Sequence, residues 1–411
     1  MYLIRYLLKL LVLLIASNAI LYIINRTTST KSTPNYDIES IFTKGIEEID
    51  IDTFCAKVAE EIRDKPILLL GEQQHTDGAT LLVKSKIVDL LRRKYNYEIV
   101  LMEGSFFYNN LLRDKILNNN SVNANDWDRA LYTYWGLSDQ TGLLRQTISN
   151  QKLDFRGFDY NYLTHSNLTG LSKYIKGYFG VDSLANYAFM YEILEKGLGP
   201  LYLFNSPYYR DRQDTCLNQI KRLTNIIKDK DSLDVQDKTM LLTLENLHDF
   251  FYANIYVPNY GNDRNMFRDS IMFKNVSYIL NNFIEEDKKV IIWAANAHQM
   301  YEPLDNGYLP MGYRLKNKFK DKVYSVLFTS GVGKNNRADR VRSINPSSLK
   351  SIEHILHKQN KNFIYSTFKD DREIIMKFLG HQNISFHWQK AMDSFIYVDK
   401  MTPITFQNNS Y

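Results

Sequence analysis

Short, almost uninterrupted apolar runs alternate along the chain with longer segments of helical periodicity. Runs of this kind, bounded by polar or turn-forming residues, are typical of strands buried on both faces of a sheet. They lie at residues 66–70, 98–102, 153–158, 289–293, 323–328, 363–366 and 394–398. Between the first two, residues 79–94 repeat apolar positions at helical spacing and end in basic residues, as a crossover helix should. The pattern predicts an α/β fold with a central, mostly parallel sheet flanked by helices.

The middle of the chain follows a different pattern. Helical periodicity runs through residues 237–255 and 263–285, with no convincing strand across residues 166–286. Strand-like runs resume only afterwards, so both ends of the body are expected to build one sheet. We therefore predict a single domain over residues 36–411 with a large helical insertion at about 166–286.

The first 35 residues differ from the body in composition. Arg5 and Lys9 precede an uncharged apolar stretch, residues 10–24, and a polar linker follows it. An apolar run of this length behind basic residues is typical of a signal peptide or a membrane anchor helix. Both interpretations stay open, because Ser17–Ala19 offers a small-x-small cleavage site, whereas the apolar residues beyond it suit an uncleaved anchor, which we favour. Either predicts an exported body, held at the membrane or released as a secreted or periplasmic protein.

The composition is that of a globular protein, with 44% hydrophobic and 24% charged residues. The formal net charge is +5, but residues 1–35 contain four basic residues and no acidic one, which leaves the body at +1. A neutral body without a run rich in Lys and Arg lacks the charge that phosphate backbones require. Nucleic acid is therefore not expected as a partner.

Cysteine is scarce, with only Cys55 and Cys216 in 411 residues. A body of this size does not need disulfides to be stable, although an oxidising compartment would permit a bridge between the two. Two cysteines are too few for a structural zinc framework.

Ionisable side chains follow four of the predicted strands. Glu72 and His75 come just after the first strand, Glu103 after the second, Asp159 after the third and His298 after the fourth. The carboxyl ends of parallel strands meet at one edge of a sheet, where open α/β folds bind their ligands. Carboxylates rarely lie unpaired at buried strand ends, which favours a functional site over four separate turn residues. For Asp159, capping of a following helix explains the position equally well.

Two glutamates and two histidines suit two kinds of chemistry. A histidine can take a proton from water while a carboxylate orients its ring, which is general acid–base catalysis. The same nitrogen and oxygen atoms could bind a divalent metal ion. The sequence does not separate these alternatives, but it contains neither the G-x-S-x-G nucleophile elbow nor an H-E-x-x-H motif.

These residues also resemble the erythromycin esterase family, in the order that the family has them. The matching motifs are Gly71-Glu72-x-x-His75, Glu103 at a strand end, Arg156-Gly157-Phe158-Asp159, Arg268-Asp269-x-x-Met272-x-x-Asn275 and Trp293-Ala294-Ala295-Asn296-Ala297-His298. The resemblance covers roughly residues 64 to 400, and five weak motifs in register over that length are a strong signal together.

The resemblance implies a metal-independent hydrolase that acts on a small-molecule carboxylic ester or lactone, such as a macrolide. By resemblance, His75 would be the general base that activates water. Glu72 and Glu103 would be supporting carboxylates, and His298 would face the substrate carbonyl. The family's cationic position nine residues after the first histidine is Arg, and here it is Lys84.

Further residues are expected to contact the substrate. Arg268 shares a helix face with Met272 and Asn275 and is therefore predicted to point inward. Asp159 and Asn296 are assigned to substrate binding together with Arg268 and Lys84.

The chain also departs from the family pattern. Thr76 follows the first histidine where Gly is common, and Ala295 replaces a histidine of the fourth motif. Two alternatives therefore stay open. One is a metal-dependent hydrolase that uses Glu72, His75, Glu103 and His298, and the other is a noncatalytic surface protein that binds haem or metal. Surface positions are expected for His381 and His387.

Overall fold

The structure is a computed structural model that describes residues 38–151, 153–160, 169–180, 187, 190, 194, 213–257, 262–337 and 340–406. The apolar stretch at the N-terminus, and with it the predicted signal peptide or anchor, lies outside these residues. Within them, no helix combines the length and the apolar character needed to cross a membrane.

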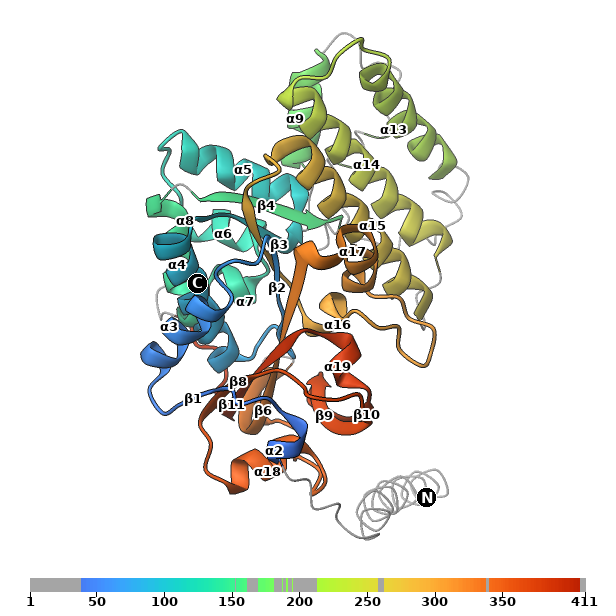
Figure 1. Ribbon diagram of the computed structural model, residues 1–411. Coiled ribbons are helices and arrows are strands. Elements are labelled where there is room, and N and C mark those ends of the chain that lie inside the picture. The colour runs from blue at the N-terminus through green and yellow to red at the C-terminus, as the bar shows by residue number, and fades with distance from the viewer. Residues whose placement is uncertain are drawn as a thin grey trace, which may run out of the picture.

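A mixed β-sheet forms the centre of the molecule (Figure 1). Its parallel part has the strand order β4 (Asp154–Asp159), β3 (Tyr97–Ser105), β5 (Lys289–Trp293), β2 (Ile67–Leu70), β6 (Val323–Arg337) and β11 (Ser394–Met401). The predicted α/β fold and parallel sheet are thus confirmed for these strands, because each forms from one of the apolar runs.

The far edge of the sheet is antiparallel, which the sequence did not indicate. There β8 (Phe363–Ser366) pairs with β11, and β1 (Ile46–Glu48) pairs with β8. In addition, β7 (Arg340–Ser343) pairs with the end of β6, and β9 (Ile374–Leu379) forms a separate hairpin with β10 (Gln382–Phe386). β1 is only three residues long and carries two glutamates, so it has no apolar signature.

Helices cover both faces of the sheet. In β2, Leu68 and Leu70 pack into the core beneath α4, whereas Ile67 and Leu69 pack toward α15 and α17. Successive side chains of a strand point to opposite faces, so a strand covered on both sides is apolar throughout. The helices concerned are α3 (Ile51–Glu61), α4 (Gly78–Tyr95) and α8 (Gly142–Gln151) on one face, and α15 (Asn262–Phe283) and α17 (Met311–Phe319) on the other.

The described part of the insertion is helical, as predicted. It consists of α9 (Thr169–Phe179), α13 (Gln213–Lys228), α14 (Val235–Tyr256) and α15. These helices share an apolar core separate from those beside the sheet, and they form the upper lobe in Figure 1. Asp234 and Asp237 form a capping box that starts α14.

Further helices connect these elements. They are α2 (Ile38–Ile41), α5 (Phe106–Leu117), α6 (Ala124–Ala130), α7 (Thr133–Gly136), α16 (Asn296–Gln299), α18 (Ile352–Lys358) and α19 (Trp388–Ala391). Two of them matter for the site, because α16 directly follows β5 and α7 places aromatic rings over the loop after β2.

Cys55 and Cys216 do not form a bridge. Both are free and buried, Cys55 in the core beneath α4 and Cys216 in the core of the insertion. Burial raises the pKa of each thiol to about 12, so both remain protonated at neutral pH. They act as small apolar core residues.

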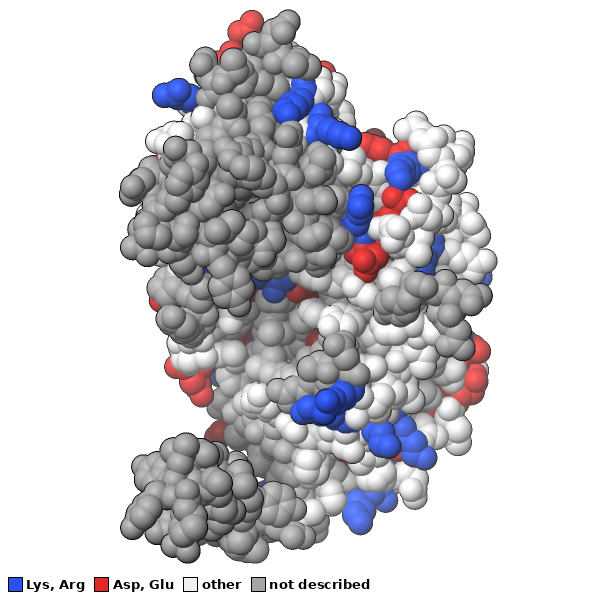
Figure 2. Space-filling model, turned by 180° about the vertical axis from the view of Figure 1, so that it is seen from behind, with Lys and Arg blue, Asp and Glu red and all other residues white. Residues whose placement is uncertain are grey.

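The surface carries mixed charge. On the face opposite to that of Figure 1, the described Lys and Arg residues are scattered among Asp and Glu and form no continuous basic patch (Figure 2). Figure 2 also shows a hollow near the middle of this face, with basic and acidic atoms at its upper edge.

Candidate active site

Strand β2 leads directly into the site through Gly71. A Cβ atom on Gly71 would lie 2.0 Å from Asn296 Oδ1, so only glycine lets the strand pass this amide. Asn296 Nδ2 donates to the carbonyls of Phe328 and Phe378 at 2.7 Å, and Oδ1 accepts from Phe328 N at 3.1 Å. Asn296 is buried, and its amide ties the start of α16 to β6 and β9. We therefore assign it to the fold rather than to substrate contact.

Glu72 is fully buried and orients His75. Its Oε1 lies 2.8 Å from His75 Nδ1 and accepts a hydrogen bond from Trp135 Nε1 at 3.1 Å. Its Oε2 accepts from Lys84 Nζ at 2.6 Å. Lys84 is itself buried, with its ammonium 3.9 Å from the centre of the Trp293 ring. Lys84 thus lies behind Glu72 and supports this carboxylate, instead of facing a substrate as predicted.

His75 is held from several sides and still reaches solvent. Tyr132 stacks on its ring with centroids 5.7 Å apart, and Trp135 packs edge-on at 4.8 Å. Its side chain remains 30% exposed. Because Nδ1 faces Glu72, Nε2 is the nitrogen left for chemistry. It lies 3.8 Å from Glu103 Oε1, too far for a hydrogen bond.

Arg268 lies on α15 of the helical insertion and contacts the carboxyl ends of strands β3 and β4. Its Nη2 donates to Glu103 Oε1 at 2.7 Å and to Asp159 Oδ2 at 2.6 Å, and its Nε donates to Asp159 at 3.0 Å. Tyr132 also donates to Asp159, at 3.0 Å. The predicted inward orientation of Arg268 is confirmed. Asp159 is buried and faces Arg268, so the structure gives it a part in holding this guanidinium.

His298 approaches the same oxygen of Glu103 as Arg268 and His75 do. Its Nε2 is 3.4 Å from Glu103 Oε1 and 3.2 Å from Arg268 Nη1. Its Nδ1 is 3.0 Å from both carboxylate oxygens of Asp269, which also accepts from Tyr308 and from the backbone N–H of Met311 at the start of α17. The helix N-terminus and Tyr308 keep Asp269 in place, and Asp269 orients the ring.

Burial and charge shift the pKa values of the cationic groups. Burial alone would lower the pKa of His75, but the carboxylates of Glu103 and Glu72 outweigh it and raise the pKa above its ordinary 6.5. For Lys84, burial prevails and lowers the pKa to about 8, although Glu72 opposes the shift.

Charged neighbours also shift the pKa values of His298 and Glu103. Burial disfavours a charged His298, yet Asp269 and Glu103 raise its pKa to about 10, so the ring is protonated at neutral pH. Burial also disfavours the Glu103 carboxylate, but His298, Arg268 and His75 hold its pKa well below the usual range. The site thus combines a partly exposed histidine that titrates above 6.5 with a cationic histidine and an ionised carboxylate.

The structure brings six predicted residues into one network: Glu72, His75, Lys84, Glu103, Arg268 and His298, with Asp159 beside it. Sequence reasoning missed the aromatic residues Tyr132 and Trp135, which follow no strand and belong to no recognised motif. Asp269 could have been found, because it directly follows Arg268 in the motif and is one of its fixed positions.

The carboxylates of the site are already engaged by hydrogen-bond donors. All four oxygens of Glu72 and Glu103 already accept hydrogen bonds, from Trp135 and Lys84 and from Arg268 and the Ala295 N–H. Within the described ranges, no group of three or more His, Cys, Asp or Glu side chains is arranged to hold a metal ion. The metal-dependent alternative therefore gains no support from the donor geometry.

A row of aromatic rings runs from the network toward the surface. Tyr160 follows Asp159 and meets Phe267, the neighbour of Arg268, with centroids 6.0 Å apart. Tyr252 of α14 stacks on Phe267 at 5.8 Å and touches Tyr256 at 5.1 Å. Tyr252 and Tyr256 are 39% and 48% exposed. The insertion thus places an accessible apolar surface next to the charged site.

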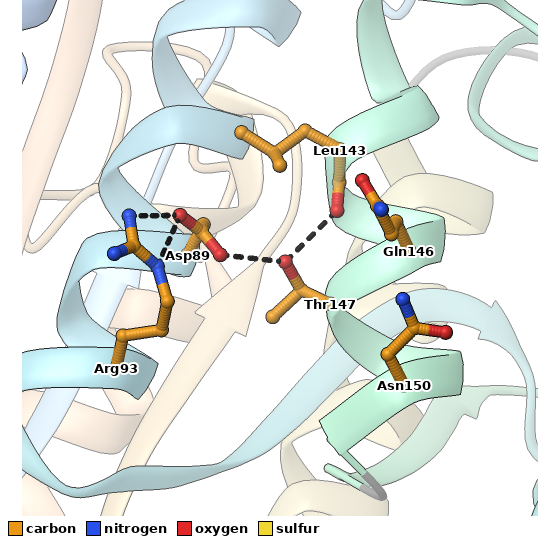
Figure 3. Close-up of a pocket in the computed structure, with 6 residues that line it drawn as sticks. All are labelled: Asp89, Arg93, Leu143, Gln146, Thr147 and Asn150. Carbon is orange, nitrogen blue, oxygen red and sulfur yellow. Dashed lines mark hydrogen bonds and ion pairs between the residues drawn. The ribbon is translucent and has the colours of Figure 1, made fainter.

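A pocket lies between α4 and α8 (Figure 3). Its volume is about 360 Å³, and it is lined by Asp89, Arg93, Leu143, Gln146, Thr147 and Asn150. Asp89 accepts from Arg93 at 2.6 Å and from Thr147 at 3.0 Å, as Figure 3 shows. Its carboxylate is thus engaged by neighbours, and we place no chemistry there.

Residues 93–403 match the family model described as erythromycin esterase. The chain belongs to the erythromycin esterase family. The matched range includes Glu103, Arg268 and His298, whereas Glu72 and His75 precede it, and the geometry described above joins the two sets. No curated protein sequence matches the chain.

Solved structures share the fold of this erythromycin esterase family member. One, described as a succinoglycan biosynthesis protein, is 14% identical with a TM-score of 0.71 and covers 90% of this chain and 96% of its own. A protein from Bacillus cereus is 13% identical with a TM-score of 0.71, covering 90% and 97%. A mutant of the erythromycin esterase EreC in its open conformation is 14% identical with a TM-score of 0.61, covering 89% and 97%. At these identities the likeness establishes the fold alone.

Proposed function

We propose that this protein hydrolyses a carboxylic ester or lactone with a water molecule activated by His75. The observation that carries the proposal is the Glu72–His75 pair, in which a buried carboxylate holds Nδ1 at 2.8 Å and directs Nε2 away from it. A base oriented in this way, partly exposed and beside an ionised site, is the arrangement that general base catalysis needs. Family membership supports a hydrolase.

In the proposed reaction, His75 Nε2 accepts a proton from water while the water oxygen attacks the ester carbonyl carbon. Glu72 stabilises the imidazolium that forms. The tetrahedral intermediate then breaks its bond to the leaving oxygen, which takes the proton from His75 and departs as an alcohol. Acid and alcohol are the products, and His75 returns to its neutral form.

The negative oxygen of the intermediate needs a nearby positive charge. Protonated His298 and Arg268 are the candidates, because both approach the same oxygen of Glu103 that lies 3.8 Å from His75 Nε2, and Arg268 is partly exposed. Lys84 is excluded from this role by its burial behind Glu72.

The pH dependence follows from the shifted pKa values. His75 must be neutral to accept a proton, so kcat/KM is expected to rise with pH through a midpoint above 6.5. It should fall again as Lys84, with a pKa of about 8, and His298, with a pKa of about 10, lose their protons. Initial rates measured from pH 5 to 11 check this bell-shaped curve. A rate that declines steadily from pH 6 upward would contradict the assignment of His75 as base.

The aromatic row is proposed to bind the part of the substrate that does not react. Tyr252→Ala removes an exposed ring next to Phe267 and is expected to raise KM about tenfold, while kcat changes less than about threefold. Steady-state kinetics separate the two constants. Tyr95→Ala, at the opposite edge of the sheet where β5 begins, is the control and should leave both unchanged. A loss confined to kcat in Tyr252→Ala would place the substrate elsewhere.

One experiment tests the proposed function against its alternatives. Residues 36–411 are purified, their bound metals are measured, and simple carboxylic esters and macrolide lactones are offered with and without EDTA. We expect turnover that EDTA does not reduce. Restoration of a lost activity by manganese or zinc would favour the metal-dependent hydrolase, and a tightly bound ligand without any turnover would favour a binding protein. Export, predicted from residues 1–35, is part of the proposal. N-terminal sequencing of the mature protein decides between its two forms, because a chain that starts at Ile20 would contradict the uncleaved anchor.

A further inference from the structure

A second buried polar cluster lies beneath the loop that carries His75. Its centre is His381, which is 2% exposed, in contrast to the surface position expected from the sequence. His381 Nε2 lies 2.9 Å from Asp77 Oδ1, and Nδ1 lies 3.2 Å from Ser330 Oγ. Serine, histidine and aspartate are the residue types of a serine hydrolase triad.

The cluster is not a triad, because its serine cannot act as a nucleophile. Ser330 is fully buried, and its hydroxyl donates to Gln73 Oε1 at 2.9 Å. The carbonyl of Lys377 accepts from Gln73 Nε2 at 2.5 Å, which fixes the direction of this amide. The hydroxyl of Ser330 is thus engaged by Gln73 and lies at one ring nitrogen of His381, while the carboxylate of Asp77 lies at the other.

Asp77 links His381 to the loop that carries His75 through hydrogen bonds. Its Oδ2 accepts a hydrogen bond at 3.0 Å from the N–H of Gln74, the residue before His75. Asn335 Nδ2 donates to both Asp77 and Gln74, at 3.1 and 2.6 Å. On the other side, Thr76 donates to the Asn336 carbonyl at 2.5 Å. The residues on either side of His75 are thus held by groups outside the loop.

The backbone supplies an independent argument for the side chain of His381. It occupies the second position of the two-residue turn between β9 and β10, with φ +61°, after Gly380 with φ +56°. Positive φ is uncommon for residues other than glycine, although asparagine, aspartate and histidine adopt it more often than the rest. The contacts of His381 to Asp77 and Ser330 offset the cost of this conformation.

We infer that His381 is a positioning residue, which sets the catalytic geometry of His75 through Asp77 and the backbone of Gln74. The inference rests on the proposed function, since it assigns His75 the role of base. It also gives the turn of the β9–β10 hairpin a purpose, because this hairpin lies outside the central sheet and its turn contacts Gln74 and Asp77 of the loop that carries His75.

The sharpest test is His381→Gly, because glycine adopts this turn without strain and the backbone should persist. We expect kcat to fall at least about tenfold with KM within about threefold, since a small displacement of a base slows the reaction without weakening binding. Hydrogen–deuterium exchange of residues 71–78 should rise. Asn360→Gly, at an exposed position that also has positive φ, is the control and should change neither quantity.

The two measurements separate the possible failures. If the wild type hydrolyses no ester, the proposed function is wrong, and exchange in residues 71–78 still decides whether His381 holds the loop. Unchanged exchange in His381→Gly overturns the inference, as does a kcat equal to that of the wild type. A variant that unfolds would show faster exchange throughout the chain. Faster exchange in the strands of the central sheet as well would therefore also contradict a local role of His381. A second variant, Asp77→Asn, should reproduce the loss of kcat.

Discussion

The substitution His75→Ala is expected to lower kcat by at least about 100-fold, the usual contribution of a general base. The reason is geometric, since His75 Nε2 is the exposed nitrogen of a ring whose other nitrogen is fixed by Glu72. The protein should stay folded, because the side chain is partly exposed and its removal leaves Glu72 with hydrogen bonds from Lys84 and Trp135. Steady-state hydrolysis of the best ester of the panel measures the loss.

The matched control for this substitution is His387→Ala. His387 is a half-exposed histidine paired with Asp371, outside the network around Glu103. It should retain the full kcat. Equal activity of His75→Ala and wild type would show that another group activates the water, and an equal loss in both variants would point to a general effect of histidine removal.

Replacing Arg268 by methionine should lower the free energy of unfolding by about 3–5 kcal/mol. Arg268 neutralises Glu103 and Asp159, which are both buried, and methionine fills much of the volume without any charge. The loss therefore reflects two carboxylates left in the interior with fewer partners. Urea unfolding followed by circular dichroism measures it.

Arg63→Met separates this effect from the loss of any ion pair. Arg63 pairs with Glu60 at the end of α3, and their side chains are 43% and 63% exposed. Solvent screens such pairs, so the cost should stay below about 1 kcal/mol. Similar losses for both variants would mean that the buried cluster contributes no more than a surface ion pair.

Much of the fold was predictable, because buried parallel strands leave continuous apolar runs. The edges where β1 and β7 pair were not, since short strands rich in charged residues look like loops. Part of the network was predictable, because residues at the carboxyl ends of parallel strands lie along one edge of the sheet. This holds for Glu72, which follows β2, and for Glu103, near the end of β3, because only β5 separates these two strands in the sheet.

The roles within the network could not be read from the sequence. Whether Lys84 faces a substrate or a carboxylate depends on the direction of its side chain within α4, and the structure places it against Glu72. The amide of Asn296 could bind a ligand, yet it forms hydrogen bonds with three main-chain groups. His381 lies about 300 residues from Asp77 along the chain, and only the folded hairpin brings them together.

The central claim is that water attacks the ester directly, without a covalent enzyme intermediate. Hydrolysis of a single equivalent of ester by metal-free enzyme in H₂¹⁸O, with quenched samples analysed by mass spectrometry, tests it most directly. We predict one ¹⁸O atom in the acid, none in the alcohol, and an enzyme of unchanged mass at every time point. An acylated enzyme during turnover, or ¹⁸O in the alcohol, would contradict the account.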